Sequence, residues 1–114
     1  MPAYILFIRE GAIHDQAEMD IYSRMTRQNP PDPKLVPLVV YGAMEAVEGA
    51  AADGIVILQF PTVEDAKAWY NSPGYQAAAA HRMKGANYRA MIVEGLPIKA
   101  PAVHELPTER GFVL

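Results

Sequence analysis

Four segments of this 114-residue chain have the composition of β-strands, and their apolar side chains fall at consecutive positions. Residues 4–8 and 55–58 are apolar without interruption. Successive side chains of a strand point to opposite faces, whereas an antiparallel sheet with one wet face alternates apolar and polar residues. These strands therefore predict a sheet that is covered on both faces.

The same pattern constrains assembly. The chain offers two helical regions, which is enough to cover one face of a small sheet. The simplest cover for the other face is a second copy of the chain. We therefore expect a homodimer in which two sheets pack face to face and bury on the order of 2,000 Å² in total.

The first helix is expected to begin after Asp15. Glu18 follows three residues later, and this spacing is typical of a capping box, in which each side chain satisfies a free backbone N–H. The four-residue spacing that follows predicts an inward apolar face formed by Ala17, Ile21 and Met25. A proline-rich segment, 29–33, ends the helix because proline lacks the N–H donor.

The remaining elements complete a recognisable order. A long or bent second strand is predicted over residues 36–48, and the third and fourth strands over 54–60 and 87–94. Between the last two, a helix capped by Thr62 is interrupted at 71–73, where Ser72 can cap a second helical piece. The order β-α-β-β-α-β predicts an α+β ferredoxin-like domain with a four-stranded antiparallel sheet.

This domain is expected to cover residues 1–95. Residues 96–114 are expected to form an extended tail rich in proline, and its apolar end, 112–114, suggests docking on the partner subunit. A frayed terminus is the alternative.

Composition narrows the function classes. The chain has no cysteine, which rules out disulfides and thiolate chemistry and fits a cytoplasmic protein. The net charge is −3 and no basic stripe is present, so nucleic acid is not an expected partner. No segment approaches the roughly 20 apolar residues that span a bilayer, and the N-terminus does not look like a signal peptide. No cofactor is expected.

One run of residues carries a family resemblance. Residues 60–76 read F-P-T-V-E-D-A-K-A-W-Y-N-S-P-G-Y-Q, and this run closely resembles the signature of the domain of unknown function 1330 family. Arg82 and the Val-Glu-Gly tripeptides at 47–49 and 93–95 also match the family pattern. The resemblance covers about residues 3–95 and implies a ferredoxin-like fold in the dimeric α+β barrel superfamily, with sheets packed face to face in a homodimer.

The resemblance implies little about activity. The wider superfamily includes cofactor-free monooxygenases, lactone isomerases, haem enzymes and binding modules, and fold alone does not choose among them. Two departures matter. Tyr41 stands about where the family has an arginine on its second strand, and the proline-rich segment 29–33 replaces a Gly-Gly turn.

Arg82 is the first candidate site residue. Tyr75, Ala78, Ala79 and Arg82 share one helical stripe, so the arginine could reach a cleft beside the sheet and bind a carboxylate or enolate. An ion pair with Glu64, Asp65 or an acid of the partner chain is the equal alternative.

The other candidates are His14, Tyr41 and Tyr70. His14 follows the first strand and could act as a general base, although an exposed loop histidine without a role is the simpler interpretation. Tyr41 or Tyr70 could orient a carbonyl. Trp69 and Tyr70 could wall a pocket or simply pack the helix onto the sheet.

Three functional hypotheses remain open. The first is a small-molecule-binding or cofactor-free catalytic module that takes a small apolar or anionic metabolite. Its pocket would lie between the sheet and the helices, lined by Tyr4 or Phe7 together with Tyr22, Tyr41, Tyr70 and Arg82. The second is a dimerisation or stress-type module without a ligand. The third is a haem or metal protein with His14 or His81 as the axial ligand, although no metal-binding motif is present.

Overall fold

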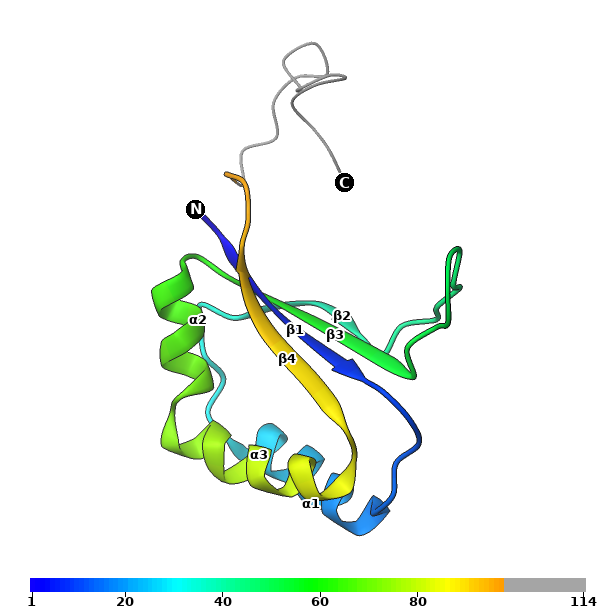
Figure 1. Ribbon diagram of the computed structural model, residues 1–114. Helices are drawn as coiled ribbons and strands as arrows, with labels where there is room; N and C mark the ends of the chain where they lie inside the picture. The colour runs from blue at the N-terminus through cyan, green and yellow to red at the C-terminus, as the bar shows by residue number, and fades with distance from the viewer. Residues whose placement is uncertain (98–114) are drawn as a thin grey trace.

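A four-stranded antiparallel sheet carries three helices against one of its faces (Figure 1). The computed structural model describes residues 1–97. In chain order the elements are β1 (Ala3–Arg9), α1 (Gln16–Gln28), β2 (Val36–Val40), β3 (Gly54–Phe60), α2 (Val63–Tyr70), α3 (Pro73–Gly85) and β4 (Tyr88–Glu94). The strand order across the sheet is β2-β3-β1-β4. The predicted ferredoxin-like α+β fold is confirmed, with α2 and α3 as the interrupted second helical region.

The register places the two sets of apolar side chains on opposite faces. Ile5 pairs with Leu58 on β3 and with Ile92 on β4, and these three side chains face the helices. The next residue, Leu6, pairs with Ile57 and Met91 on the face that the helices leave open. The helix side forms the core, whose buried members are Ala3, Ile5, Phe7, Leu58, Phe60, Ala66, Tyr75 and Ala79.

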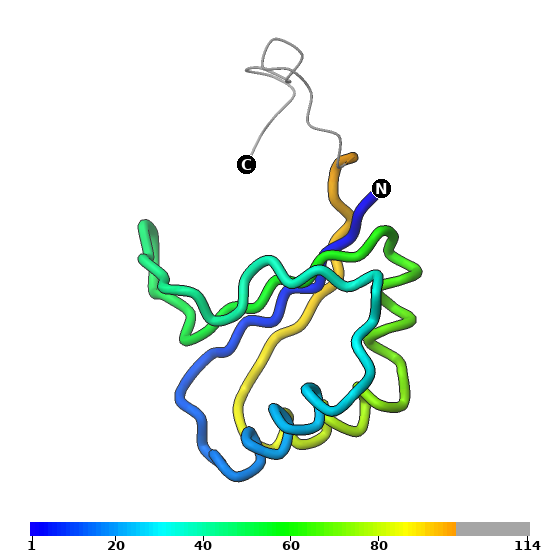
Figure 2. The backbone as a smooth tube through the Cα atoms, turned by 180° about the vertical axis from the view of Figure 1, so that it is seen from behind, coloured from blue at the N-terminus to red at the C-terminus, as the bar shows by residue number. Residues whose placement is uncertain are grey.

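The open face is apolar, as the sequence predicted. Leu6, Ile8 and Ile57 are half-buried there, while Met91 is 40% and Val93 48% exposed. Figures 1 and 2 show all three helices on the same side of the sheet, so no described element covers this surface. An exposed apolar patch of this kind marks an interaction surface.

Helix α1 differs from the prediction in two ways. The Asp15 carboxylate accepts a hydrogen bond from the Glu18 N–H at 3.3 Å, as expected of the cap. The Glu18 carboxylate, however, binds His81 on α3 instead of returning to the cap, so only half of the capping box forms. The inward face is also rotated, because α1 packs along α3: Met19 is buried there, whereas Ala17 is exposed.

The second strand is shorter than predicted. Strand β2 ends at Val40, and residues 41–50 are all exposed. The reason is the length of its neighbour: β3 begins at Gly54, and Val40 already pairs with Val56 near that end. A longer β2 would have no partner strand, and the backbone turns at Tyr41, where φ is 52°.

The break between α2 and α3 was predicted and is present. The Ser72 hydroxyl accepts a hydrogen bond from the Tyr75 N–H at 3.4 Å and donates one to the Trp69 carbonyl at 2.7 Å. Pro73 occupies the first turn of α3, where a missing N–H costs nothing. Ser72 therefore joins two helices and fixes the angle at which Trp69 and Tyr75 approach each other.

The expected tail lies mostly outside the described residues, which end at Pro97. Its docking on a partner subunit, and the domain boundary at residue 95, stay predictions. Among residues 1–97, no helix is both long and apolar enough to span a bilayer.

We expect Ser72→Ala to lower the free energy of unfolding by roughly 1–2 kcal/mol, because it removes an N-cap and a second hydrogen bond at the same hydroxyl. Urea denaturation followed by circular dichroism measures the loss. Ser72→Thr keeps the hydroxyl and is the control. Equal stability of the alanine and threonine variants would show that the cap does not hold this break.

Candidate functional site

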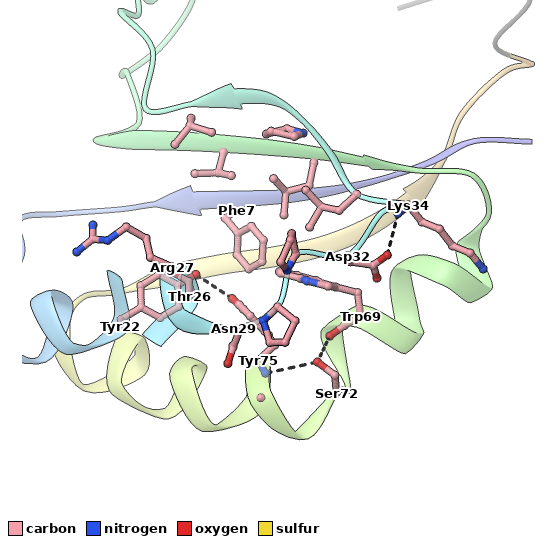
Figure 3. Close-up of a pocket in the computed structure, with 18 of the residues that line it drawn as sticks. Phe7, Tyr22, Thr26, Arg27, Asn29, Asp32, Lys34, Trp69, Ser72 and Tyr75 are labelled. Carbon is pink, nitrogen blue, oxygen red and sulfur yellow. Dashed lines mark hydrogen bonds between the residues drawn. The ribbon is translucent and has the colours of Figure 1, made fainter. Parts of the chain in front are cut away.

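A cleft of about 1210 Å³ opens between the helix face of the sheet and the helices (Figure 3). Its walls come from all four strands on one side and from α1, α2 and α3 on the other. The proline-rich segment 29–33 runs along its rim. Phe7 from β1 and Trp69 from α2 both face this space in Figure 3. A largely apolar cleft with a few polar groups is the usual form of a small-molecule site.

Arg82 is the most unusual residue of the cleft. Its side chain is on α3 and lines the cleft, yet the residue is only 3% exposed. Its guanidinium carbon lies 5.3 Å from the ring centre of Phe7, 5.9 Å from that of Tyr22 and 5.1 Å from that of Tyr88. Three aromatic rings therefore surround the cation, and their negative faces attract it.

No acid neutralises Arg82 within residues 1–97. Of the two acids on its own chain that the sequence suggested, Asp65 pairs with Lys34 at 2.9 Å, and Glu64 is exposed and forms no ion pair with Arg82. The buried Nε of Arg82 has no hydrogen-bond partner in the described part of the chain. A buried charge without a partner is costly, and such groups cluster at binding sites.

Two hydrogen-bonded tyrosine pairs stand beside the arginine. The hydroxyls of Tyr22 and Tyr75 lie 3.1 Å apart, and those of Tyr41 and Tyr88 lie 2.6 Å apart. All four tyrosines line the cleft. Within a pair one hydroxyl donates to the other, which leaves one O–H per pair free to donate to a ligand.

Burial keeps three of these hydroxyls protonated. Burial is the main cause that raises the pKa of Tyr22, and the electrostatic effect of the neighbouring Tyr75 is the second. Burial also raises the pKa of Tyr75, against the opposing effects of Tyr22 and Arg82. The pKa of Tyr88 is raised by burial and then by its bond to Tyr41. Beside these tyrosines the cleft thus offers the Arg82 cation and neutral O–H donors, which suits an anion that carries further oxygen acceptors.

Trp69 serves the core and the cleft together. Its ring lies 4.2 Å from that of Tyr75 and 5.7 Å from that of Phe60, centre to centre. It also lines the cleft. The two roles considered for Trp69 from the sequence, pocket wall and helix packing, are therefore both met.

The structure brings together some of the predicted site residues and separates others. Tyr41 and Arg82 line the cleft, as do Phe7 and Tyr22. Tyr70 packs against Tyr75 but does not line the cleft. Tyr4 lies on the open face, opposite Val93.

His14 is exposed on the loop before α1 and lies outside the cleft lining. His81, the other histidine considered for haem, is bound to the Glu18 carboxylate. Residues 1–97 hold no group of three His, Asp or Glu side chains placed to bind a metal.

Two of the four cleft tyrosines, Tyr75 and Tyr88, were not proposed as site residues from the sequence. Tyr75 lies on the same helical stripe as Arg82, so the spacing signal was present. Tyr88 alternates with Ala90 and Ile92 along β4, and this alternation places it on the helix face. Its position under Arg82 depends on how α3 crosses the sheet, which no local pattern encodes.

Residues 2–96 match the family described as domain of unknown function (DUF1330). The chain belongs to this family. The DUF1330 match covers all seven described elements, so the resemblance noted in the sequence is confirmed. No curated protein matches the sequence.

Solved structures share the fold at low identity. An ethyl tert-butyl ether d (ethd) family protein from Bacillus halodurans is 16% identical, with a TM-score of 0.57 over 84% of this chain and 100% of that one. A protein of unknown function from Rhodopseudomonas palustris is 15% identical, with a TM-score of 0.57 over 84% of this chain and 83% of that one. A dimeric ferredoxin-like protein of unknown function from Thermobifida fusca is 13% identical, with a TM-score of 0.53 over 82% of this chain and 90% of that one. At such identities the likeness establishes the fold alone.

The buried tyrosines predict loss of stability at high pH. Because folding raises the pKa of Tyr22 and Tyr75 above the ordinary value near 10, the unfolded state releases their protons first. The free energy of unfolding should therefore be unaffected by these tyrosines below about pH 10. Above it, the free energy should fall by about 1.4 kcal/mol per pH unit for each tyrosine that stays protonated in the folded state. Tyrosinate absorbance should rise in two steps, the second coinciding with unfolding. A single step with all six tyrosines titrating in the folded protein would contradict this.

Proposed function

We propose that this DUF1330 protein binds a small apolar anion, a carboxylate or an enolate, in the cleft beside Arg82. The observation that carries the proposal is Arg82, which is only 3% exposed, has a buried Nε without a hydrogen-bond partner and forms no ion pair with any acid of residues 1–97. An anionic ligand would complete this charge pair.

The energetic argument rests on the surroundings of the cation. The cost of removing Arg82 from water has already been met in the folded protein, and the aromatic rings offset only part of it. A bound carboxylate would therefore gain a charge-assisted hydrogen bond in a site of low dielectric, where such bonds are stronger than in water. The planar guanidinium also suits two-point binding of a carboxylate.

The rest of the cleft supports an apolar body on the ligand. Phe7, Leu58 and Trp69 line it, and they offer a large apolar contact area. The free O–H groups of the two tyrosine pairs would donate to further ligand oxygens. We propose binding without a catalytic step, since His14, the general base expected from the sequence, lies outside the cleft.

We further propose that the protein is a homodimer joined through the open face of the sheet. The half-buried and exposed apolar residues of this face support it, because a lone sheet with such a surface would associate. The Thermobifida fusca protein with the same fold is described as dimeric. A ligand-free dimerisation module is the alternative, and the binding experiment below distinguishes the two.

Replacing Arg82 should weaken anion binding. We expect Arg82→Gln to raise the dissociation constant for octanoate about tenfold or more, because a charge-assisted hydrogen bond is lost. Isothermal titration calorimetry measures this, with Arg24→Gln on the exposed face of α1 as the matched control.

Two outcomes would count against the ligand site. If Arg82 pairs with an acid of the partner chain, Arg82→Gln should lower the melting temperature and leave binding unchanged. If no anion in a broad panel of carboxylates binds or raises the melting temperature, the dimerisation module is the better conclusion.

A charge on the open face should separate the dimer. Met91 and Met83 are both exposed, at 40% and 57%, but Met91 is on the open face and Met83 is on α3. In a two-fold interface Met91→Glu adds a buried carboxylate from each protomer, so we expect monomers at micromolar concentration. Light scattering after gel filtration measures the mass, and Met83→Glu should remain dimeric. A wild-type monomer would overturn the assembly proposed here.

A further inference from the structure

Two hollows on the helix side of the sheet share a wall. The larger is the cleft that holds Arg82. The smaller is a pocket of about 200 Å³. Four residues line this pocket and not the cleft: Arg9, Ile13, Gln16 and Met19. The residues that line both are Tyr22, Ser23, Tyr41 and Tyr88. The bonded pair of Tyr41 and Tyr88 therefore stands between the two spaces.

Tyr41 is held in this wall against its backbone preference. Its φ of 52° lies in the left-handed region, and it is the only non-glycine residue of positive φ in residues 1–97. Bulky residues rarely adopt this conformation, whereas glycine and asparagine adopt it readily. A strained residue at a pocket points to a role for its side chain.

Two neighbours brace the Tyr41 ring. Gly54 at the start of β3 makes room for it, since a Cβ there would lie 2.8 Å from the ring atom Cδ1. The Tyr41 hydroxyl is bonded to that of Tyr88 at 2.6 Å. Because β2 and β4 are the two edges of the sheet, this bond spans β3 and β1 on the helix side.

Arg82 lies directly beside this wall. Its guanidinium carbon is 5.1 Å from the Tyr88 ring centre, and Arg82 lines the cleft but not the smaller pocket. A carboxylate bound to Arg82 would therefore place its first carbon next to the tyrosines. Trp69 and the segment 29–33 line the cleft but not the smaller pocket, so the cleft extends beyond the shared wall on their side.

We propose that Tyr41, braced by Gly54 and Tyr88, is a specificity-determining partition that makes the site select carboxylates that are unbranched next to the carboxyl group. The tail of such a ligand extends toward Trp69, whereas a branch at the carbon beside the carboxylate meets the tyrosine wall. Removing the Tyr41 ring joins the two pockets and gives the branch a place. This inference rests on anion binding at Arg82.

Octanoate and its isomer valproate, which is branched next to the carboxylate, test the partition with equal charge and composition. We expect the wild-type protein to bind octanoate more tightly in calorimetry. Tyr41→Gly suits the backbone at this position and should shift the ratio of the two dissociation constants about tenfold in favour of valproate. Tyr41→Asn, which also suits positive φ, should shift it in the same direction.

Two further variants separate the ring from other effects. Tyr41→Phe keeps the ring and loses only the bond to Tyr88, so we expect a shift smaller than about threefold. Met83→Ala, on the exposed side of α3, should not change the ratio. If octanoate binds in an Arg82-dependent way and both Tyr41→Gly and Tyr41→Asn keep the wild-type ratio, the partition is wrong and anion binding stands. If neither acid binds the wild-type protein, both proposals are overturned.

Discussion

Burial of the Arg82 guanidinium without an acid beside it governs the site. A guanidinium tolerates such a position better than an ammonium, because its charge is delocalised and its faces stack on aromatic rings. Phe7, Tyr22 and Tyr88 provide those rings from three different elements. Ala78 and Ala79, both buried on the same side of α3, allow the helix to come close enough for this contact. The aromatic cleft and the small helical residues are thus two consequences of placing one cation inside.

Strand β1 links this site to the open face. Phe7 contacts Arg82 on the helix side, while its neighbours Leu6 and Ile8 lie on the open face. A slip of one residue in the register would exchange the two sets and move the core residues to the open side. The same alternation therefore builds the cleft and the surface through which we propose the dimer forms, and neither can change without the other.

Much of the fold could be predicted because its signals are local. The apolar alternation, the Ser72 cap and the stripe that carries Arg82 all follow from spacing along the chain. The errors arose where tertiary contacts decide. Glu18 binds His81 instead of its own cap, and β2 ends where β3 no longer offers a partner. The Ser72 turn directs Tyr75, and not Tyr70, into the cleft. The cytoplasmic location and the tail stay predictions.

In the anion site that we propose, Tyr41 places a neutral side chain near Arg82. The family resemblance implies an arginine near this position, and Tyr41 lines the same cleft as Arg82 and bonds to the tyrosine that contacts it. A second guanidinium there would add like charge near Arg82 and favour a ligand with two negative charges. Tyrosine instead contributes a neutral hydroxyl and a rigid ring. The departure from the family pattern thus leaves Arg82 as the cation beside the tyrosines in the site that we propose for an anion.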